Sequence, residues 1–354
     1  MTQSAVARTG TPPTDERVIL SVQNLRTQFT TDAGIVRAVD GVSFDIRRGE
    51  VFAVVGESGS GKSVTAMSVM GLIPTPPATI EADGVFWKGE DLLAQGEERM
   101  RSVRGGEIGM IFQDPLTALN PVHTVGRQIG EMARIHERLS RREARTRAIE
   151  MLGLVGIPQP ASRVDMYPHE FSGGMRQRAV IAMAITCNPD LLIADEPTTA
   201  LDVTVQAQVL EVLMRIKDEI DSSIMIITHD LGVVAGVADN VMVMYAGRQV
   251  EFGTAKEIFY RTRHPYTLGL MASIPRLDAD EDDKLIPIRG APPSMIHLPS
   301  GCSFHPRCDF ARERCAVEEP ALRHVVGTSH RSACHFAEEL EDADLRAVHD
   351  WSQP

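Results

Sequence analysis

The sequence predicts an α/β fold in which a largely parallel sheet carries helices on its faces, with an inserted helical block and a smaller C-terminal unit. Three observations support this fold class. Strand-like apolar runs alternate with helical segments along most of the chain. A glycine-rich loop joins the apolar run Val51–Val55 to a helical run at Val64–Leu72. After about Tyr260 the composition shifts toward Pro, His and Cys, which indicates a second unit.

The elements follow in order from the N-terminus. Residues 1–17 are polar and without periodicity, so we expect a disordered tail. Helical spacing of Ala144, Ala148, Leu152 and Val155 indicates that residues 114 to about 185 are mainly helical. Strand patterns occur at Ile19–Leu25, Val36–Ile46, Val51–Val55, Glu107–Phe112, Asp190–Ala194, Ser223–Thr228 and Val241–Tyr245. We therefore expect a first domain over 18–260, containing the helical subdomain, and a C-terminal extension over 261–354.

The charge balance argues against one class of function. The 354 residues include 36 Lys and Arg against 48 Asp and Glu, a net charge of −12. A general nucleic-acid binder usually has a basic surface, so we expect no nucleic-acid partner. No apolar run approaches the ~18–20 residues of a membrane span, and the N-terminus lacks a signal-peptide pattern. We expect a cytoplasmic protein.

The stretch GESGSGKS has the pattern of a phosphate-binding loop. Gly56, Gly61, Lys62 and Ser63 fit G-x-x-x-x-G-K-[ST]. Small residues let successive backbone N–H groups surround a triphosphate, while the lysine reaches the β- and γ-phosphates and the serine hydroxyl ligates Mg²⁺. A strand before the loop and a helix after it make a chance glycine-serine turn a poor explanation. The residues between the first and last glycines belong to the same candidate ATP site; they are Glu57, Ser58, Gly59 and Ser60.

Two carboxylates end the apolar run LLIADEP. Asp195 lies where it can contact Mg²⁺, and Glu196 lies where a carboxylate can polarise a water in line with the γ-phosphate. Taken alone, such a pair would most simply cap a helix. Its distance from the phosphate loop is that expected within one nucleotide fold.

A second anion site is predicted at FSGGMRQR. Ser172, Gly173 and Gly174 precede a helical run, so a hydroxyl and bare backbone N–H groups lie at a helix N-terminus. One chain needs only one triphosphate cradle. The second site therefore suggests that two chains share each nucleotide.

With these residues the sequence resembles the ATP-binding-cassette (ABC) family, whose signature is usually LSGGQ. The resemblance covers roughly residues 18–260 and implies a phosphate-loop nucleotide-binding domain of ABC type. Gln113 matches the family's glutamine loop, Ala200-Leu201-Asp202 the loop after the second carboxylate, and His229 the switch histidine. Met175 stands where the signature usually has Gln, so we expect ATP binding to survive with altered detail at the dimer face.

The resemblance also implies roles for these residues. Family members dimerise head to tail and trap ATP between one chain's phosphate loop and the other's signature. Gln113 then senses Mg²⁺ and the attacking water, Glu196 is the base, and His229 contacts the γ-phosphate. Asp202 would link the two sites across the dimer, and Phe29 is the nearest candidate for stacking on adenine.

Beyond the cassette, HPYTLGLMASIP, IRGAPPS and LPSGCSFHPRC resemble the C-terminal extension of oligopeptide and dipeptide importer ATPases. This implies an ATP-hydrolysing motor at the cytoplasmic face of the membrane, the first of two different ATPase chains. Its partners would be the second ATPase, two integral-membrane permeases and an extracytoplasmic substrate-binding protein. Importers of nickel or other small solutes share the extension and are the alternative. A soluble DNA-repair ATPase is the alternative from another class, disfavoured because the chain has no sustained heptads.

Four of the five cysteines lie in the extension at C-x5-C-x6-C-x18-C spacing: Cys302, Cys308, Cys315 and Cys334. Disulfides are not expected in a cytoplasmic chain. Wide spacing in loops suits a [4Fe–4S] cluster, which is the first interpretation. Zn²⁺ is the second, because zinc sites commonly use C-x2-C pairs that are absent from this spacing. Inert thiols are the third. His305 and His335 neighbour the cysteines; we interpret them as surface or capping histidines, with replacement of one cysteine ligand as the alternative. Cys187 is interpreted as a small core residue.

A basic run lies in the helical block, and we interpret it as a solvated helix face, with permease docking as the alternative. Its members are Arg134, Arg138, Arg141, Arg142, Arg145 and Arg147.

Overall fold

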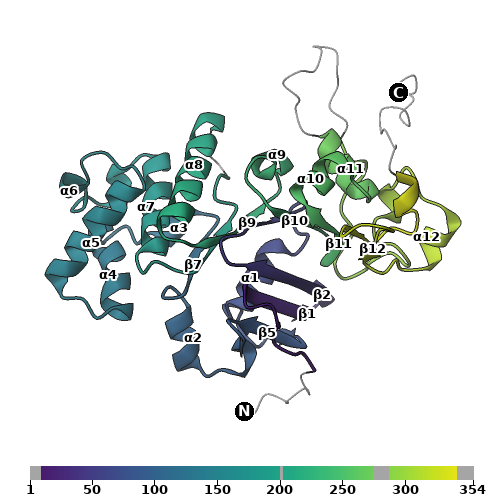
Figure 1. The fold of residues 1–354 in the computed structure, drawn as a ribbon, viewed down its shortest axis with the longest axis horizontal. Coiled ribbons are helices and arrows are strands. Elements are labelled where there is room, and N and C mark those ends of the chain that lie inside the picture. Colours follow the sequence, from purple (N-terminus) through teal and green to yellow (C-terminus); the bar gives the residue numbers. More distant parts are fainter. Residues whose placement is uncertain (1–8, 200–201, 274–286, 341–354) are drawn as a thin grey trace.

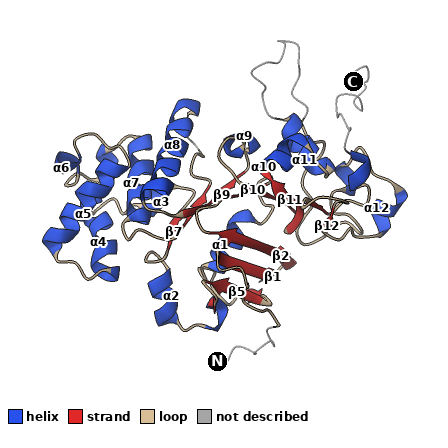
Figure 2. Cartoon of the chain, viewed as in Figure 1, coloured by secondary structure: helices blue, strands red, loops and turns tan. Residues whose placement is uncertain are grey.

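The computed structural model describes residues 9–199, 202–273 and 287–340. Figure 1 shows the elements in space, and Figure 2 shows the strands in the middle with helices toward both ends. The strands are β1 Val18–Thr31, β2 Gly34–Arg47, β3 Val51–Val55, β4 Ala78–Glu81, β5 Gly84–Trp87, β6 Glu90–Asp91, β7 Ile108–Ile111, β8 Leu191–Asp195, β9 Ser223–Thr228, β10 Asn240–Tyr245, β11 Arg248–Thr254, β12 Arg323–His324 and β13 Arg331–Ser332. The α-helices are α1 Lys62–Val69, α2 Glu97–Val103, α3 Pro115–Ala118, α4 Val125–His136, α5 Arg141–Leu154, α6 Pro160–Arg163, α7 Gly173–Ile185, α8 Val203–Glu219, α9 Leu231–Val234, α10 Ala255–Tyr260, α11 Pro265–Ala272 and α12 Glu313–Val317.

The central sheet has the strand order β12-β13-β11-β10-β3-β9-β8-β7. Its five strands from β10 to β7 run parallel, whereas β11 and β13 are antiparallel to their neighbours. The parallel strands β3, β8 and β9 are buried along their whole length, as their continuous apolar sequences require. Because the carboxyl ends of parallel strands meet at one edge of a sheet, the loops that follow β3, β7, β8 and β9 converge there. The predicted α/β fold with a largely parallel sheet is confirmed.

Alternation along β3 gives the central sheet a core on each face. Val51, Ala53 and Val55 belong to a core shared with the helical block and with α8. Phe52 and Val54 belong to a second core shared with α1 and with a five-stranded antiparallel sheet of order β2-β1-β5-β6, in which β4 also pairs with β1. Strands β4, β5 and β6 were not predicted, because they are short and carry no long apolar run.

Helices α3 to α7 lie between Pro115 and Ile185, within the segment for which helices were expected. Helix α7 packs against α4, α5 and α8, and Figure 1 shows this group at one end of the molecule, away from α12. None of the helices within the described ranges is long and apolar enough to span a membrane.

The segment after Tyr260 is joined to the central sheet. Strand β13 pairs with β11, and Tyr266 and Phe304 are buried in the same core as Val51 and Val55. At the other end of the chain, residues 9–17 are described as irregular chain, and the Gly10 amide donates to the Asp83 carbonyl at 3.1 Å. Residues 1–8 of the expected tail lie outside the described residues.

Candidate functional site

The phosphate loop connects β3 to α1, and glycine is required at both of its ends. Gly56 and Gly61 have φ of 153° and 102°, backbone conformations that favour glycine. A Cβ on Gly56 would lie 2.2 Å from the Met244 carbonyl oxygen, and one on Gly61 would lie 2.2 Å from that of Ala38. The loop therefore wraps closely against the neighbouring backbone, as the motif predicts.

Lys62 and Ser63 open α1 beside the loop. The Lys62 Nζ donates to the carbonyl oxygens of Gly56 and Glu57 at 2.8 and 3.0 Å. Burial lowers the pKa of Lys62, and nearby carboxylates oppose that shift. The Ser60 Oγ is buried and has no hydrogen-bond partner among the described residues. A buried ammonium and an unsatisfied hydroxyl in a glycine loop are suited to receive an anion.

Asp195 ends strand β8 opposite the start of α1. Its Oδ1 accepts a hydrogen bond from the Ser63 hydroxyl at 2.8 Å, and the residue is 5% exposed. Burial raises the pKa of Asp195, and the neighbouring Glu196 adds to that rise, while Ser63 and Lys62 oppose it. A hydroxyl and a buried carboxylate in contact are the ligands expected at a phosphate-bound Mg²⁺.

Glu196 lies where the loops that follow strands β7, β8 and β9 meet. Its Oε2 lies 3.0 Å from the Gln113 Nε2, 2.8 Å from the Thr199 Oγ1 and 3.4 Å from the His229 Nδ1. Glu196 has φ of 47°, which is costly for a residue with a side chain and is typical of functional sites. Its side chain is 10% exposed and that of His229 is 53% exposed, so the carboxylate is fixed while the histidine faces solvent.

The structure does not bring the signature to this group. Ser172 is the N-cap of α7, and its hydroxyl accepts from the Met175 amide at 3.4 Å, with Gly173 and Gly174 opening the helix. Helix α7 begins there as expected, but within the described part of the chain no hydrogen bond or ion pair joins these residues to the phosphate loop. Their exposed position fits a surface that acts on another molecule.

Two further predicted residues have ordinary structural contacts in the single chain. Asp202 is the N-cap of α8 and accepts from the Val205 amide at 3.0 Å. Phe29 is half-buried in β1 and pairs with Val36 and Ala78 in the antiparallel sheet. Residues 200 and 201, expected to precede Asp202 in its loop, lie outside the described residues.

The four cysteines of the extension line one pocket, together with His305 and His335. All four cysteines are free thiols, and burial raises the pKa of Cys308 to about 12 and that of Cys334 to about 11. The His305 Nδ1 lies 2.9 Å from the Cys302 carbonyl oxygen, and the His335 Nε2 lies 2.9 Å from that of Glu318. Within the described part of the chain, no three His, Cys, Asp or Glu side chains are grouped closely enough to hold one metal ion. Cys187 is half-buried and remote from these thiols in sequence.

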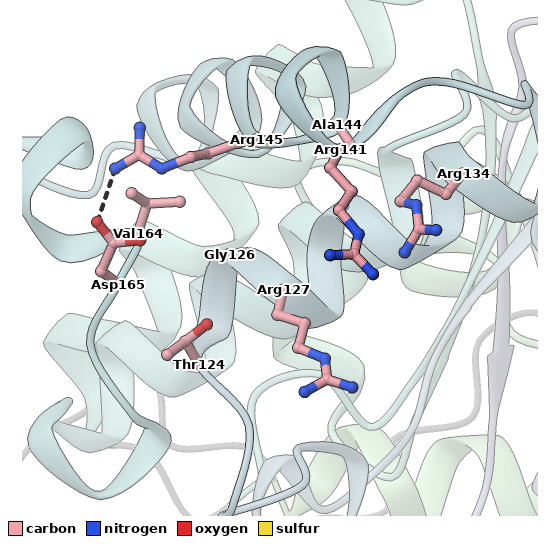
Figure 3. A pocket seen from close by; sticks show the side chains of 10 residues that line it. Thr124, Gly126, Arg127, Arg134, Arg141, Ala144, Arg145, Val164 and Asp165 are labelled. Atoms are coloured by element: carbon pink, nitrogen blue, oxygen red, sulfur yellow. Dashed lines mark hydrogen bonds and ion pairs between the residues drawn. The ribbon is translucent and has the colours of Figure 1, made fainter.

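The basic run contributes to a pocket between α4 and α5. Arg127 and Arg134 from α4, with Arg141 and Arg145 from α5, line it. Figure 3 shows Arg145 paired with Asp165, at 2.6 Å, and the other three guanidinium groups turned toward the same open space. Over the described ranges these three have no carboxylate partner. The face is exposed as expected, but it is concave and carries unpaired positive charge.

Three further residues around the site were not among those predicted from the sequence. Thr199 bonds Glu196, and its position three residues after the carboxylate was an available signal. Tyr266 and Arg307 both contact Glu57 in the phosphate loop. They lie in the extension, and nothing in their local sequence indicates that contact.

Comparison with known families gives two matches that follow each other along the chain. Residues 39–199 match the family described as ABC transporter. Residues 250–315 match the family described as oligopeptide/dipeptide transporter, C-terminal region. The first range contains the phosphate loop, signature and both carboxylates, and the second contains three of the four extension cysteines.

Curated relatives match over nearly the full chain. The dipeptide transport ATP-binding protein DppD of Bacillus subtilis is 57% identical, covering 94% of this chain and 96% of the relative. The oligopeptide transport ATP-binding protein OppD of Bacillus subtilis is 53% identical, with coverages of 88% and 87%.

Among solved structures, the dimeric post-hydrolysis state of the ATP-binding cassette MJ0796 bound to ADP and Pi is 25% identical, with a TM-score of 0.59, covering 67% of this chain and 98% of that one. The structure of cbiO1 from Clostridium perfringens, part of the ABC transporter complex cbiONQ, is 29% identical with a TM-score of 0.59, and the coverages are 69% and 91%.

Proposed function

The chain belongs to the ABC transporter ATPases named for dipeptide and oligopeptide transport, and on this premise we propose that it hydrolyses ATP to drive import of short peptides. One observation carries the proposal of a competent ATP site. The phosphate loop, the carboxylate pair, Gln113 and His229 are linked by hydrogen bonds and close contacts at one edge of the parallel sheet.

The proposed chemistry assigns a task to each side chain. Backbone N–H groups from Gly56 to Ser63 cradle the phosphates, and Lys62 exchanges its carbonyl partners for phosphate oxygens. Ser63 and Asp195, with Gln113 close by, would hold Mg²⁺, and the ion would supply positive charge for the phosphates. Glu196 takes the proton of the attacking water, and its three neighbours keep its Oε2 directed to the site.

We further propose that the site is completed by a second ATPase chain, arranged head to tail. Support comes from the exposed helix N-terminus at Ser172–Gly174, which would face the γ-phosphate held by the partner chain. His229 would reach the same phosphate from its exposed position, and Asp202 would lie at the dimer contact. Phe29 remains the proposed adenine neighbour. A solved relative is named as a dimer with ADP and phosphate bound, which is consistent with this arrangement.

Membrane permeases are partners of an ABC importer ATPase, and this chain contributes no span in its described helices. We propose that its partners are two permeases, a second and homologous ATPase chain that forms a heterodimer with it, and an extracytoplasmic peptide-binding protein, with the chain at the cytoplasmic face. The basic pocket of α4 and α5 is the proposed contact for an acidic permease segment, because its unpaired arginines would gain partners there.

For the extension we propose a [4Fe–4S] cluster held by Cys302, Cys308, Cys315 and Cys334. Two observations support a fit: the four thiols line one pocket, and the one ring nitrogen described for each neighbouring histidine already contacts a carbonyl oxygen. A single Zn²⁺ needs four ligands at about 2.0–2.3 Å from one point, and the described residues contain no such group. A cluster spreads four thiolates over four irons, which tolerates wider spacing.

The function is tested in proteoliposomes that contain the permeases and both ATPases, with the binding protein outside. We expect hydrolysis to be stimulated by short peptides and not by Ni²⁺. Stimulation by Ni²⁺ alone would favour the small-solute alternative. A hydrolysis rate that is the same with and without the permeases would favour a soluble ATPase.

A further inference from the structure

A residue of the phosphate loop is held by a side chain 250 positions further along the sequence. Both carboxylate oxygens of Glu57 accept from Arg307, with Nη1 at 2.7 Å and Nη2 at 2.9 Å. The Arg307 side chain is 6% exposed and that of Glu57 is 26% exposed, so the pair is largely shielded from water. Arg307 immediately precedes Cys308, which means that the extension reaches into the ATP site.

The guanidinium is itself fixed in place. Its Nε donates to the Arg289 carbonyl oxygen at 2.8 Å, while Nη1 and Nη2 also donate to the Tyr245 hydroxyl and the Gly290 carbonyl oxygen. The rings of Tyr245 and Phe304 lie 5.8 and 5.9 Å from its Cζ. A guanidinium has five N–H donors in a rigid fork. Two of them bond the Glu57 carboxylate and the other three bond Arg289, Tyr245 and Gly290, so all five are used. A lysine ammonium could not form this bidentate pair of hydrogen bonds with the carboxylate.

The backbone of Glu57 is held from the extension as well. Its amide donates to the hydroxyl of the fully buried Tyr266 at 2.7 Å. Its carbonyl oxygen accepts from the Lys62 Nζ at 3.0 Å and from the Ser60 amide at 3.2 Å. The extension therefore fixes the position of Glu57, and the backbone of Glu57 in turn bonds Lys62 and Ser60 of the loop.

We propose that Arg307 is a positioning residue for ATP binding, which holds the phosphate loop, through Glu57, in the conformation that receives the phosphates. The inference rests on the proposed function, because it concerns the same ATP site. The competing explanation is that the pair only stabilises the fold. A buried ion pair is weak support for stability, because desolvation of the charges offsets their attraction. The two explanations differ in the ATP affinity they predict for variants that remain folded.

The test uses the full chain with Arg307→Met, Glu57→Gln, the double variant of these two, and Arg307→Lys. Arg314→Met is the matched control, since Arg314 makes an exposed ion pair with Glu318 in the same extension. Two quantities are measured for each variant: the Kd for a fluorescent ATP analogue, and the thermal midpoint without nucleotide.

We expect Arg307→Met and Glu57→Gln each to raise the Kd about 10- to 100-fold, as loss of charge-assisted hydrogen bonds would. The double variant should bind no more weakly than the singles, because the two residues act through one contact. Its thermal midpoint should nevertheless return toward the wild-type value, since no unpaired charge remains buried. Arg307→Lys should fall between wild type and Arg307→Met, and Arg314→Met should leave the Kd unchanged.

A double variant that regains both the wild-type midpoint and the wild-type Kd would overturn the inference and leave a purely stabilising pair. If Arg307→Met fails to fold, the double variant and Arg307→Lys still decide the question. A wild-type chain that does not bind the analogue would instead contradict the proposed function, so the two failures are distinguishable.

Discussion

Replacing Glu196 with glutamine should abolish turnover while leaving ATP binding nearly intact. The amide keeps one oxygen, which can occupy the Oε2 position and accept from Gln113, Thr199 and His229 as the carboxylate does. The ground-state site is therefore retained, and we expect the Kd for ATP to change by less than about twofold. Loss of a general base typically slows a reaction about 10²–10⁴-fold, which corresponds to about 2.7–5.4 kcal/mol in the barrier.

The assay is steady-state phosphate release from the assembled importer, with nucleotide binding measured in parallel. The importer with wild-type chain and the importer with Glu196→Gln are compared. In both, the catalytic glutamate of the second ATPase is replaced by glutamine, so that hydrolysis reports on the site that contains residue 196. Glu211→Gln, the same change on the exposed face of α8, is the control and should hydrolyse ATP at the wild-type rate. Phosphate release from Glu196→Gln within tenfold of wild type would rule out Glu196 as the base.

Three further predictions concern other parts of the chain. Lys62→Ala should weaken ATP binding about 10- to 100-fold and reduce hydrolysis as well, because Lys62 contacts ground-state phosphates; equilibrium binding at unchanged Kd would refute this. Anaerobically purified chain should be brown, absorb near ~400 nm and carry close to four irons, and Cys308→Ser should lose iron and loosen the extension before ATP turnover falls. One zinc and no iron would exclude the cluster, and no metal at all would exclude both. Reversing the charge of Arg127 and Arg134 together should weaken capture by the permeases about tenfold without changing the Kd for ATP. Arg142→Glu, which does not line the pocket, is the control, and an equal loss in that variant would contradict a role for the pocket.

The local chemistry of the ATP site could be predicted from sequence because its motifs are short. The glycines at 56 and 61 are dictated by a turn that only this residue type allows, and Lys62 follows them at the spacing of the motif. Likewise, the apolar runs at β3, β8 and β9 are long enough to be recognised as strands of a buried parallel sheet.

What the sequence could not supply is the pairing of distant segments. The meeting of Gln113, Glu196 and His229 depends on the strand order β3-β9-β8-β7, which no local pattern encodes. The ion pair of Arg307 with Glu57 spans 250 residues, and each of the two residues would pass alone for an ordinary surface charge. Among the described residues the signature at Ser172 makes no contact with the phosphate loop, and its proposed partner surface belongs to another molecule.

The most direct test of the account is uptake of a labelled short peptide into proteoliposomes that contain both ATPases and both permeases, with ATP on the side of the ATPases. The account predicts uptake against a gradient that requires ATP and the binding protein and that stops when this chain carries Glu196→Gln. Peptide uptake that continues with that variant at the wild-type rate, or ATP hydrolysis by the complete assembly with no peptide moved, would contradict it.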